Sequence, residues 1–132
     1  MKTLNALFDH PRFGTILLRW TLAILMIFHG WAKVTGGVGG IEGMLVGKGL
    51  PAFLAYGVYI GELVAPLFLL IGLWVVPAAL VIAINMAVAV ALAHMTHFMD
   101  ITASGGWRLE LQAFFFMTAL VVALTHRLGP NK

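Results

Sequence analysis

The chain has 132 residues, of which 61% are hydrophobic and only 10% are charged. This apolar share exceeds that of ordinary soluble domains, and the length leaves room for one domain. The net charge of +3 is spread over loops and ends, which argues against nucleic-acid binding. The chain contains no cysteine, which excludes disulfides, thiolate metal sites and thiol redox chemistry.

Four long apolar runs follow one another along the chain. At 1.5 Å per residue, a run of about 20 residues can cross a hydrocarbon core of about 30 Å. The Gly-rich stretch between the first two runs predicts a loop with a short interfacial segment around Ile41 to Val46. The second and third runs are joined so closely that their helices must be antiparallel neighbours. The predicted spans are residues 15–34, 52–75, 77–98 and 107–125. The sequence therefore predicts an all-α fold, an integral membrane four-helix bundle that forms a single transmembrane domain over residues 1–132.

Basic residues flank the apolar runs unequally. With four spans, both termini are expected on the same side of the lipid bilayer. Cytoplasmic flanks of membrane helices carry an excess of Lys and Arg. The side with the termini carries Lys2, Arg12, Arg19, Arg127 and Lys132, whereas Lys33, Lys48 and Arg108 flank the other side. This distribution favours cytoplasmic termini.

A few ionisable residues interrupt the apolar runs. A charged group in hydrocarbon costs a few kcal/mol, so such residues usually face the interior of a bundle, pair with one another and mark a functional site. Most of them fall toward the side opposite the termini, which predicts a polar pocket in the outer half of the bundle. They are His29, Lys33, Glu62, His94, His97 and Glu110.

Glu62 is the costliest of these residues, because it lies roughly 15 Å from the start of its helix and so close to the bilayer midplane. On the first helix, Arg19, His29 and Lys33 fall within an arc of about 80°, as one inward-facing stripe would. A buried acid and base could hydrogen-bond a quinone carbonyl and relay its protons. An interhelical ion pair that only fixes the packing is an equally open interpretation.

The end of the third run contains His94, Met95, His97 and Met99. Imidazole with thioether ligands suits copper, and paired histidines suit haem. Methionine is nevertheless common in apolar helices, so the pattern favours satisfied interfacial histidines over a metal site. No metal site is predicted, and His94 and His97 are the weak candidates for one.

The order of several short motifs resembles the DoxX family of small bacterial membrane proteins. These motifs are Arg19, His29-Gly30 with Lys33, Gly49-Leu50-Pro51, Glu62 followed by Gly72, a histidine at the end of the third run, and Gly105-Gly106 with Glu110. The resemblance covers nearly the whole chain. Pro66 departs from it, because family members usually carry small residues after the glutamate of the second helix.

The resemblance implies a multi-pass protein of the bacterial inner (cytoplasmic) membrane. The family is named from a subunit of a thiosulfate:quinone oxidoreductase, which implies a quinone-linked role. On this basis Glu62, His29 and Lys33 are the candidate catalytic residues. The candidates for binding the quinone are Arg19, His97, Glu110 and Trp107.

Whether the protein is an enzyme stays open at this point. A quinone-linked oxidoreductase subunit would need a soluble or membrane redox partner, because the sequence has no nucleotide, flavin or iron-sulfur motif. The alternatives are a non-catalytic membrane scaffold or partner subunit, and a small transporter or metal-handling protein. Small-residue faces on the helices suit contacts within one chain or in a homo-oligomer.

Overall fold

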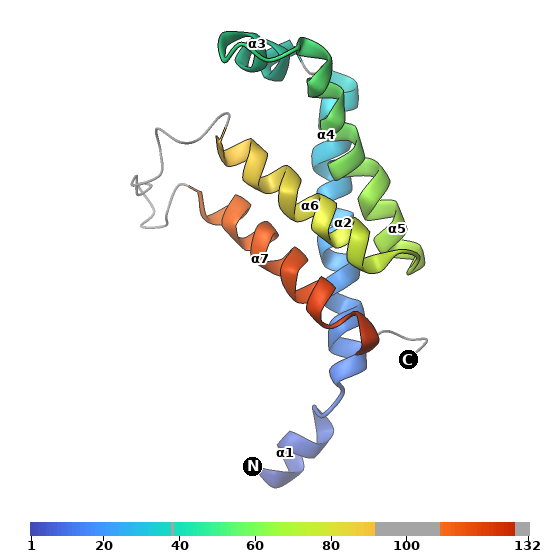
Figure 1. The fold of residues 1–132 in the computed structure, drawn as a ribbon. Coiled ribbons are helices and arrows are strands. Elements are labelled where there is room, and N and C mark those ends of the chain that lie inside the picture. The colour runs from blue at the N-terminus through green and yellow to red at the C-terminus, as the bar shows by residue number, and fades with distance from the viewer. Residues whose placement is uncertain (38, 92–108, 129–132) are drawn as a thin grey trace.

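A computed structural model of the protein describes residues 1–37, 39–91 and 109–128, and it contains no strand over these residues. Four apolar helical rods lie side by side (Figure 1). The second rod changes from 3₁₀ to α, to π and back to α geometry along its length. The rods are α2 (Pro11–Gly36), the rod built from η1 (Ala52–Tyr56), α4 (Gly57–Tyr59), η2 (Ile60–Val64) and α5 (Ala65–Ile71), then α6 (Val75–Ala89) and α7 (Glu110–Leu124).

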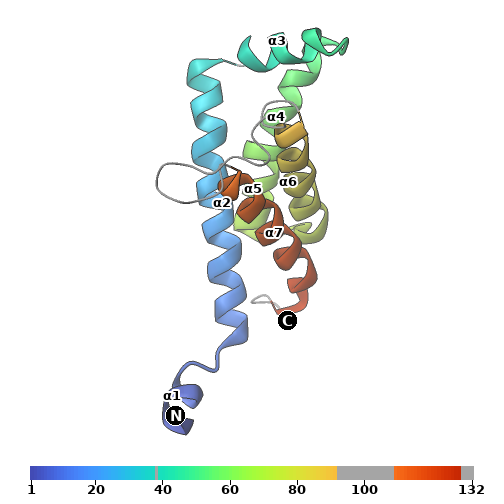
Figure 2. The ribbon, with the colours of Figure 1, turned by 90° about the vertical axis from the view of Figure 1, so that its left-hand side faces the viewer.

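Short helices lie at the two ends of these rods. The helix α3 (Gly39–Gly47) crosses one end, whereas α1 (Lys2–Leu7) and η5 (His126–Leu128) lie toward the other end (Figures 1 and 2). The sequence predicted a loop with a short interfacial segment where α3 lies. The helix extends beyond that segment at both ends, and Leu45 within it packs onto Ala55 of the second rod, with Ile41 and Tyr59 beside them.

Two of the rods are long and apolar enough to cross a membrane. They are Pro11–Gly36 and Ala52–Ile71, whereas α6 and α7 are shorter apolar helices within the described residues. The predicted range 15–34 lies inside α2, and the predicted range 107–125 contains α7. The predicted range 77–98 begins inside α6, and its part beyond Ala91 lies outside the described residues.

The turn between α5 and α6 falls earlier than the sequence predicted. The second range was expected to continue to residue 75, but α5 ends at Ile71 because Gly72 adopts a left-handed conformation with φ 78°. The N–H groups of Gly72 and Leu73 both donate to the carbonyl of Phe68, which closes the helix. Pro77 then lies in the first turn of α6, where its missing N–H costs nothing.

The core between the rods consists of small and medium apolar side chains. Small residues allow membrane helices to approach one another closely, because packing rather than water exclusion holds helices together in lipid. Ala23, Ala65, Ala79, Ala83 and Ala119 are all buried in this core.

Large apolar side chains cover the outside of the rods. Ile71 is 70% exposed and Leu124 is 82% exposed, and many residues of the same kind line the outer faces of α2, α6 and α7. A water-soluble surface rarely exposes such a continuous apolar area. These faces are suited to contact with lipid.

The rods bring four specific helix ends together. Residues toward the end of α2, in the second rod, at the end of α6 and at the start of α7 line one cavity, together with Ile41 and Met44 of α3. The ionisable residues of the apolar runs were expected to converge at these four ends.

Candidate functional site

Glu62 is the centre of a polar cluster between the helices. It lies in η2 and is only 3% exposed, yet both of its carboxylate oxygens have a partner from another helix. Lys33 Nζ of α2 donates to Glu62 Oε1 at 2.8 Å, and Asn85 Nδ2 of α6 donates to Glu62 Oε2 at 3.1 Å. The carboxylate therefore ties three helices together, and the Lys33 ammonium neutralises its charge.

Two glycines allow these three helices to approach closely around Glu62. A Cβ atom on Gly30 of α2 would lie 2.6 Å from the backbone oxygen of Glu62 and equally close to Leu63 Cγ. A Cβ atom on Gly61 would lie 2.6 Å from Asn85 Cβ. Any larger residue at either position would push the helices apart.

The π-helical turn around Glu62 has a local cause in the sequence. Pro66 has no N–H, so it cannot donate to the carbonyl of Glu62 four residues earlier, and its ring would collide with that carbonyl in a regular α-helix. The backbone widens over Ile60–Val64 instead. Turns of this kind are frequent at functional sites. The residue that departs from the family pattern thus shapes the backbone that carries the buried acid.

His29 lies one turn before Lys33 on α2. Its Nδ1 is 2.9 Å from the carbonyl oxygen of Leu25, and because a carbonyl only accepts, Nδ1 carries a proton. The other ring nitrogen, Nε2, is therefore the one available to a ligand. The ring also meets Phe115 of α7 edge to face, with 5.4 Å between the centroids.

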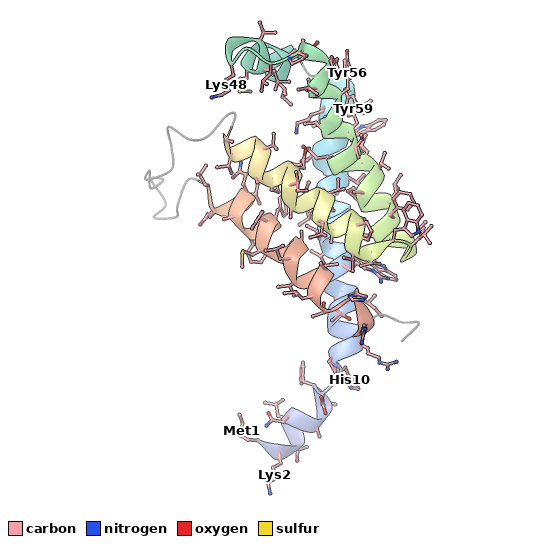
Figure 3. All side chains as sticks on the ribbon, in the orientation of Figure 1. Met1, Lys2, His10, Lys48, Tyr56 and Tyr59 are labelled. Atoms are coloured by element: carbon pink, nitrogen blue, oxygen red, sulfur yellow. The ribbon has the colours of Figure 1, made fainter. Side chains whose placement is uncertain are left out.

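Tyr59 holds the end of α2 against the second rod. Its Oη donates to the backbone carbonyl of Lys33 at 3.2 Å. Figure 3 shows Tyr59 near the α3 end of the rods, far from His10 at the start of α2. This bond fixes the backbone from which the Lys33 side chain extends, and so orients the ion pair.

A cavity of about 200 Å³ opens beside this cluster. Its polar groups come from all four rods, and most of its lining is apolar. Few polar groups in a mostly apolar pocket are typical of a small-molecule site. The lining residues are His29, Lys33, Ile41, Met44, Val58, Glu62, Asn85, Met86, Val88, Ala89, Leu111, Gln112 and Phe115.

The cluster can donate hydrogen bonds into the cavity. Lys33 Nζ has three N–H donors and its side chain is 28% exposed, and only one of those donors is accounted for by Glu62. His29 offers Nε2 as acceptor when neutral and as donor when protonated. The geometry therefore suits a ligand that presents carbonyl oxygens and an otherwise apolar body.

The structure brings together three of the residues that the sequence singled out. Glu62, Lys33 and His29 all line the cavity. Arg19 does not, because it precedes Lys33 by 14 residues on one straight helix and so lies about 21 Å away along the axis. It lines a separate, small cavity near η5.

Glu110 was expected to face the bundle, but it is exposed in the first turn of α7 and does not line the cavity. Helix α7 begins at Glu110 itself, which places this side chain at the rim of the rods. The other predicted residues, His94, His97 and Trp107, lie outside the described residues.

Asn85 is a site residue that the sequence analysis did not identify. It is the only amide in the apolar run of α6, and a buried amide in lipid needs a partner just as a charge does. The signal that marks it is an amide within an apolar run. The same signal marks Gln112 of α7, which lines the same cavity.

The described residues contain no group of three or more His, Asp or Glu that could hold a metal ion. The two histidines suggested as weak metal ligands, His94 and His97, fall outside this part of the chain.

The fold and the site define a class of protein. Apolar faces surround helices that enclose a neutralised ion pair and a small cavity, as in membrane proteins that bind a ligand between their helices. The DoxX family model matches residues 14–95, which is more than half of the chain, and the chain belongs to the DoxX family. This membership and the apolar helices together point to a membrane protein. The comparisons with curated proteins and with solved structures gave no match.

Proposed function

We propose that the protein is a multi-pass four-helix bundle of the bacterial inner membrane, with cytoplasmic termini, and that it is the quinone-binding subunit of an oxidoreductase. The quinone headgroup would occupy the cavity beside Lys33 and Glu62, in the outer half of the bundle. The observation that carries this proposal is a mostly apolar cavity lined by His29 and by Lys33, whose ammonium keeps N–H donors that Glu62 does not use.

The groups that line the cavity suit the chemistry of a quinone headgroup. A quinone carbonyl accepts hydrogen bonds, and Lys33 Nζ retains donors that Glu62 does not use. Phe115 offers an aromatic ring to the flat headgroup, and its contact with His29 holds that ring in place.

An apolar groove continues from the cavity and suits the isoprenoid chain of a quinone. The groove has a volume of about 310 Å³ and lies between α3, the second rod and α6. It shares Ile41, Val58, Asn85 and Val88 with the cavity, so the two spaces adjoin. A lipid-soluble ligand could place its polar end beside Lys33 and its chain in the groove.

The proposed reaction balances with a redox partner. Quinone, when bound, supplies a two-electron acceptor that takes up two protons on reduction to quinol. The electrons would come from a partner protein that carries its own redox group. His29 is suited to pass a proton toward the cavity through Nε2. Lys33 and Glu62 would orient the headgroup, and their opposite charges would cancel beside it.

A second function has its own supporting observation. Both carboxylate oxygens of Glu62 are satisfied by Lys33 and Asn85, which is what a purely structural interhelical cluster would show. In that case the protein would be a membrane scaffold or partner subunit. The two functions predict the same contacts and differ in whether the cavity holds a ligand.

Retention of quinone by the purified protein separates the two functions. The test is to purify the protein in mild detergent, extract it with organic solvent and measure quinones by mass spectrometry. A second arm adds a short-chain quinone and measures binding. We expect quinone in the wild type, and at least a tenfold loss in Ala89→Phe, which fills the cavity without removing any charge.

The matched control for this experiment is Ala87→Phe. Ala87 is exposed, lies two residues from Ala89 on α6 and does not line the cavity. It should retain quinone at the wild-type level. If the wild type neither retains quinone nor binds it when added, the scaffold function replaces the redox function.

A further inference from the structure

Arg19 is a buried cation without a partner in the described part of the chain. It is 7% exposed, and its Nε has no hydrogen-bond partner. The described residues include no salt bridge to Arg19, in contrast to Lys33. A buried guanidinium carries its charge at any physiological pH, so this arrangement is costly unless an anion binds there.

The level of Arg19 in the membrane follows from the residue that it contacts. Its terminal nitrogens lie 3.5 and 3.7 Å from the position that a Cβ atom on Gly72 would occupy. Gly72 lies in the turn that joins α5 to α6, and a turn between two spans lies at the membrane surface rather than at its middle. This step relies on the membrane placement but not on the quinone proposal. Arg19 is therefore close to the layer of lipid headgroups.

The surroundings of Arg19 are polar, basic and free of acids among the described residues. A cavity of about 10 Å³ is lined by Arg19 together with Thr15, Val75, Val122, Thr125 and His126. His126 Nδ1 is 2.9 Å from the carbonyl oxygen of Ala123, so this ring also has Nε2 left for a ligand. The hydroxyl groups of Thr15 and Thr125 already donate to the carbonyls of Arg12 and Val121. The guanidinium of Arg19 is therefore the donor that the lining offers to an oxyanion, and a protonated His126 would add a second donor through Nε2.

We propose that Arg19 is the centre of an oxyanion site that binds a phosphate group at the membrane surface formed by the α5–α6 turn and η5. The cavity admits about one water-sized group. A single phosphate oxygen would enter it, and the rest of the group would stay outside. A phosphodiester in the headgroup of an anionic lipid and a free phosphate ion share this chemistry.

Native mass spectrometry distinguishes the two sources. The protein is purified in a neutral detergent and incubated with phosphatidylglycerol or phosphatidylcholine at equal concentration. A parallel arm measures thermal unfolding in inorganic phosphate against chloride at matched ionic strength. If the ligand is a lipid headgroup, phosphatidylglycerol is retained in preference to phosphatidylcholine; if it is a free ion, phosphate raises the unfolding temperature.

Two substitutions locate the site. Arg19→Gln should reduce phosphatidylglycerol retention, or the phosphate effect, by at least tenfold. Arg19→Lys should give an intermediate loss, because an ammonium keeps the charge but lacks the planar fork. Arg12→Gln is the matched control, since Arg12 lies on the same helix but is exposed, and it should change retention less than twofold.

The wild-type measurements do not depend on whether any variant folds. A wild type that shows neither a preference for phosphatidylglycerol nor stabilisation by phosphate overturns the proposal. Equal losses in Arg19→Gln and Arg12→Gln would also overturn it, because they would show general attraction to basic residues rather than a site.

Discussion

The two ends of the helical rods differ in how a buried charge is partnered. Near α3, Lys33 and Asn85 satisfy both carboxylate oxygens of Glu62. Near η5, Arg19 is buried at 7% exposure but has no partner among the described residues. The two cations belong to the same helix, yet the Lys33 side chain is 28% exposed and paired, whereas Arg19 is more deeply buried and unpaired.

This difference separates a self-sufficient cluster from an incomplete one. The Lys33 end is complete without a ligand, so its cavity can accept and release a molecule while the helices stay together. The Arg19 end has a charge that the described residues do not neutralise, so we expect its ligand to remain bound. The four predictions below test this contrast, from the largest expected effect to the smallest.

The Lys33→Met substitution should have the largest effect on stability. It leaves the Glu62 carboxylate buried without its cation, which we expect to lower the free energy of unfolding by about 3 kcal/mol. Unfolding by heat or denaturing detergent measures this change. Lys48→Met is the matched control, because Lys48 is exposed after α3 and should change stability by less than about 0.5 kcal/mol.

The double variant Lys33→Met with Glu62→Leu sharpens this prediction. Removing both charges should recover most of the lost stability, since an apolar pair can replace a buried ion pair. No recovery in the double variant would mean that Lys33 stabilises the bundle by some contact other than Glu62.

Gly30→Ala should have the second largest effect. The added Cβ would lie 2.6 Å from the Glu62 backbone oxygen and from Leu63 Cγ, which is closer than Cβ atoms approach other atoms in real proteins. Helix α2 must therefore move, and we expect the free energy of unfolding to fall by about 2 kcal/mol. Gly14→Ala is the control on the same helix, where nothing lies within 4 Å of the new atom. It should leave stability unchanged or raise it by up to about 1 kcal/mol. Equal losses at both positions would contradict the close packing at Gly30.

Asn85→Leu should lower stability by about 1 kcal/mol, because Glu62 Oε2 loses its only donor in the described structure. The variant should also weaken binding of added quinone, since Asn85 lines both the cavity and the groove. Asn5→Leu, on the exposed helix α1, is the control and should alter neither property. Unchanged stability in Asn85→Leu would show that Glu62 does not depend on this amide.

Arg19→Met should have the smallest effect when no oxyanion is present. The buried charge is not paired in the described structure and is costly without an anion, so its removal should raise the unfolding free energy by up to about 1 kcal/mol in phosphate-free neutral detergent. A loss near 3 kcal/mol, as expected for Lys33→Met, would indicate a protein partner for Arg19 and remove the contrast between the two ends.

The sequence predicted the helical fold class and the convergence of His29, Lys33 and Glu62 because both depend on local periodicity and on the cost of charge in lipid. Arg19 was expected at the same site because it shares the azimuth of His29 and Lys33, but a shared azimuth does not bring residues together when they lie far apart along the helix axis. The π-helical turn around Glu62 follows from Pro66, which has no N–H for the Glu62 carbonyl, and the periodicity of the apolar residues does not reveal this effect. The partner of Glu62 on α6 depends on close approach through Gly61, and no pattern within one helix predicts such an approach.

Photocrosslinking with an azidoquinone tests the central claim most directly, because it reports where a quinone sits rather than whether one is present. We predict labelling of cavity residues such as Met44, Met86 and Phe115, competition by unlabelled quinone, and loss of labelling in Ala89→Phe but not in Ala87→Phe. Labels confined to the lipid-facing side chains, without competition, would contradict a quinone site beside Lys33 and Glu62.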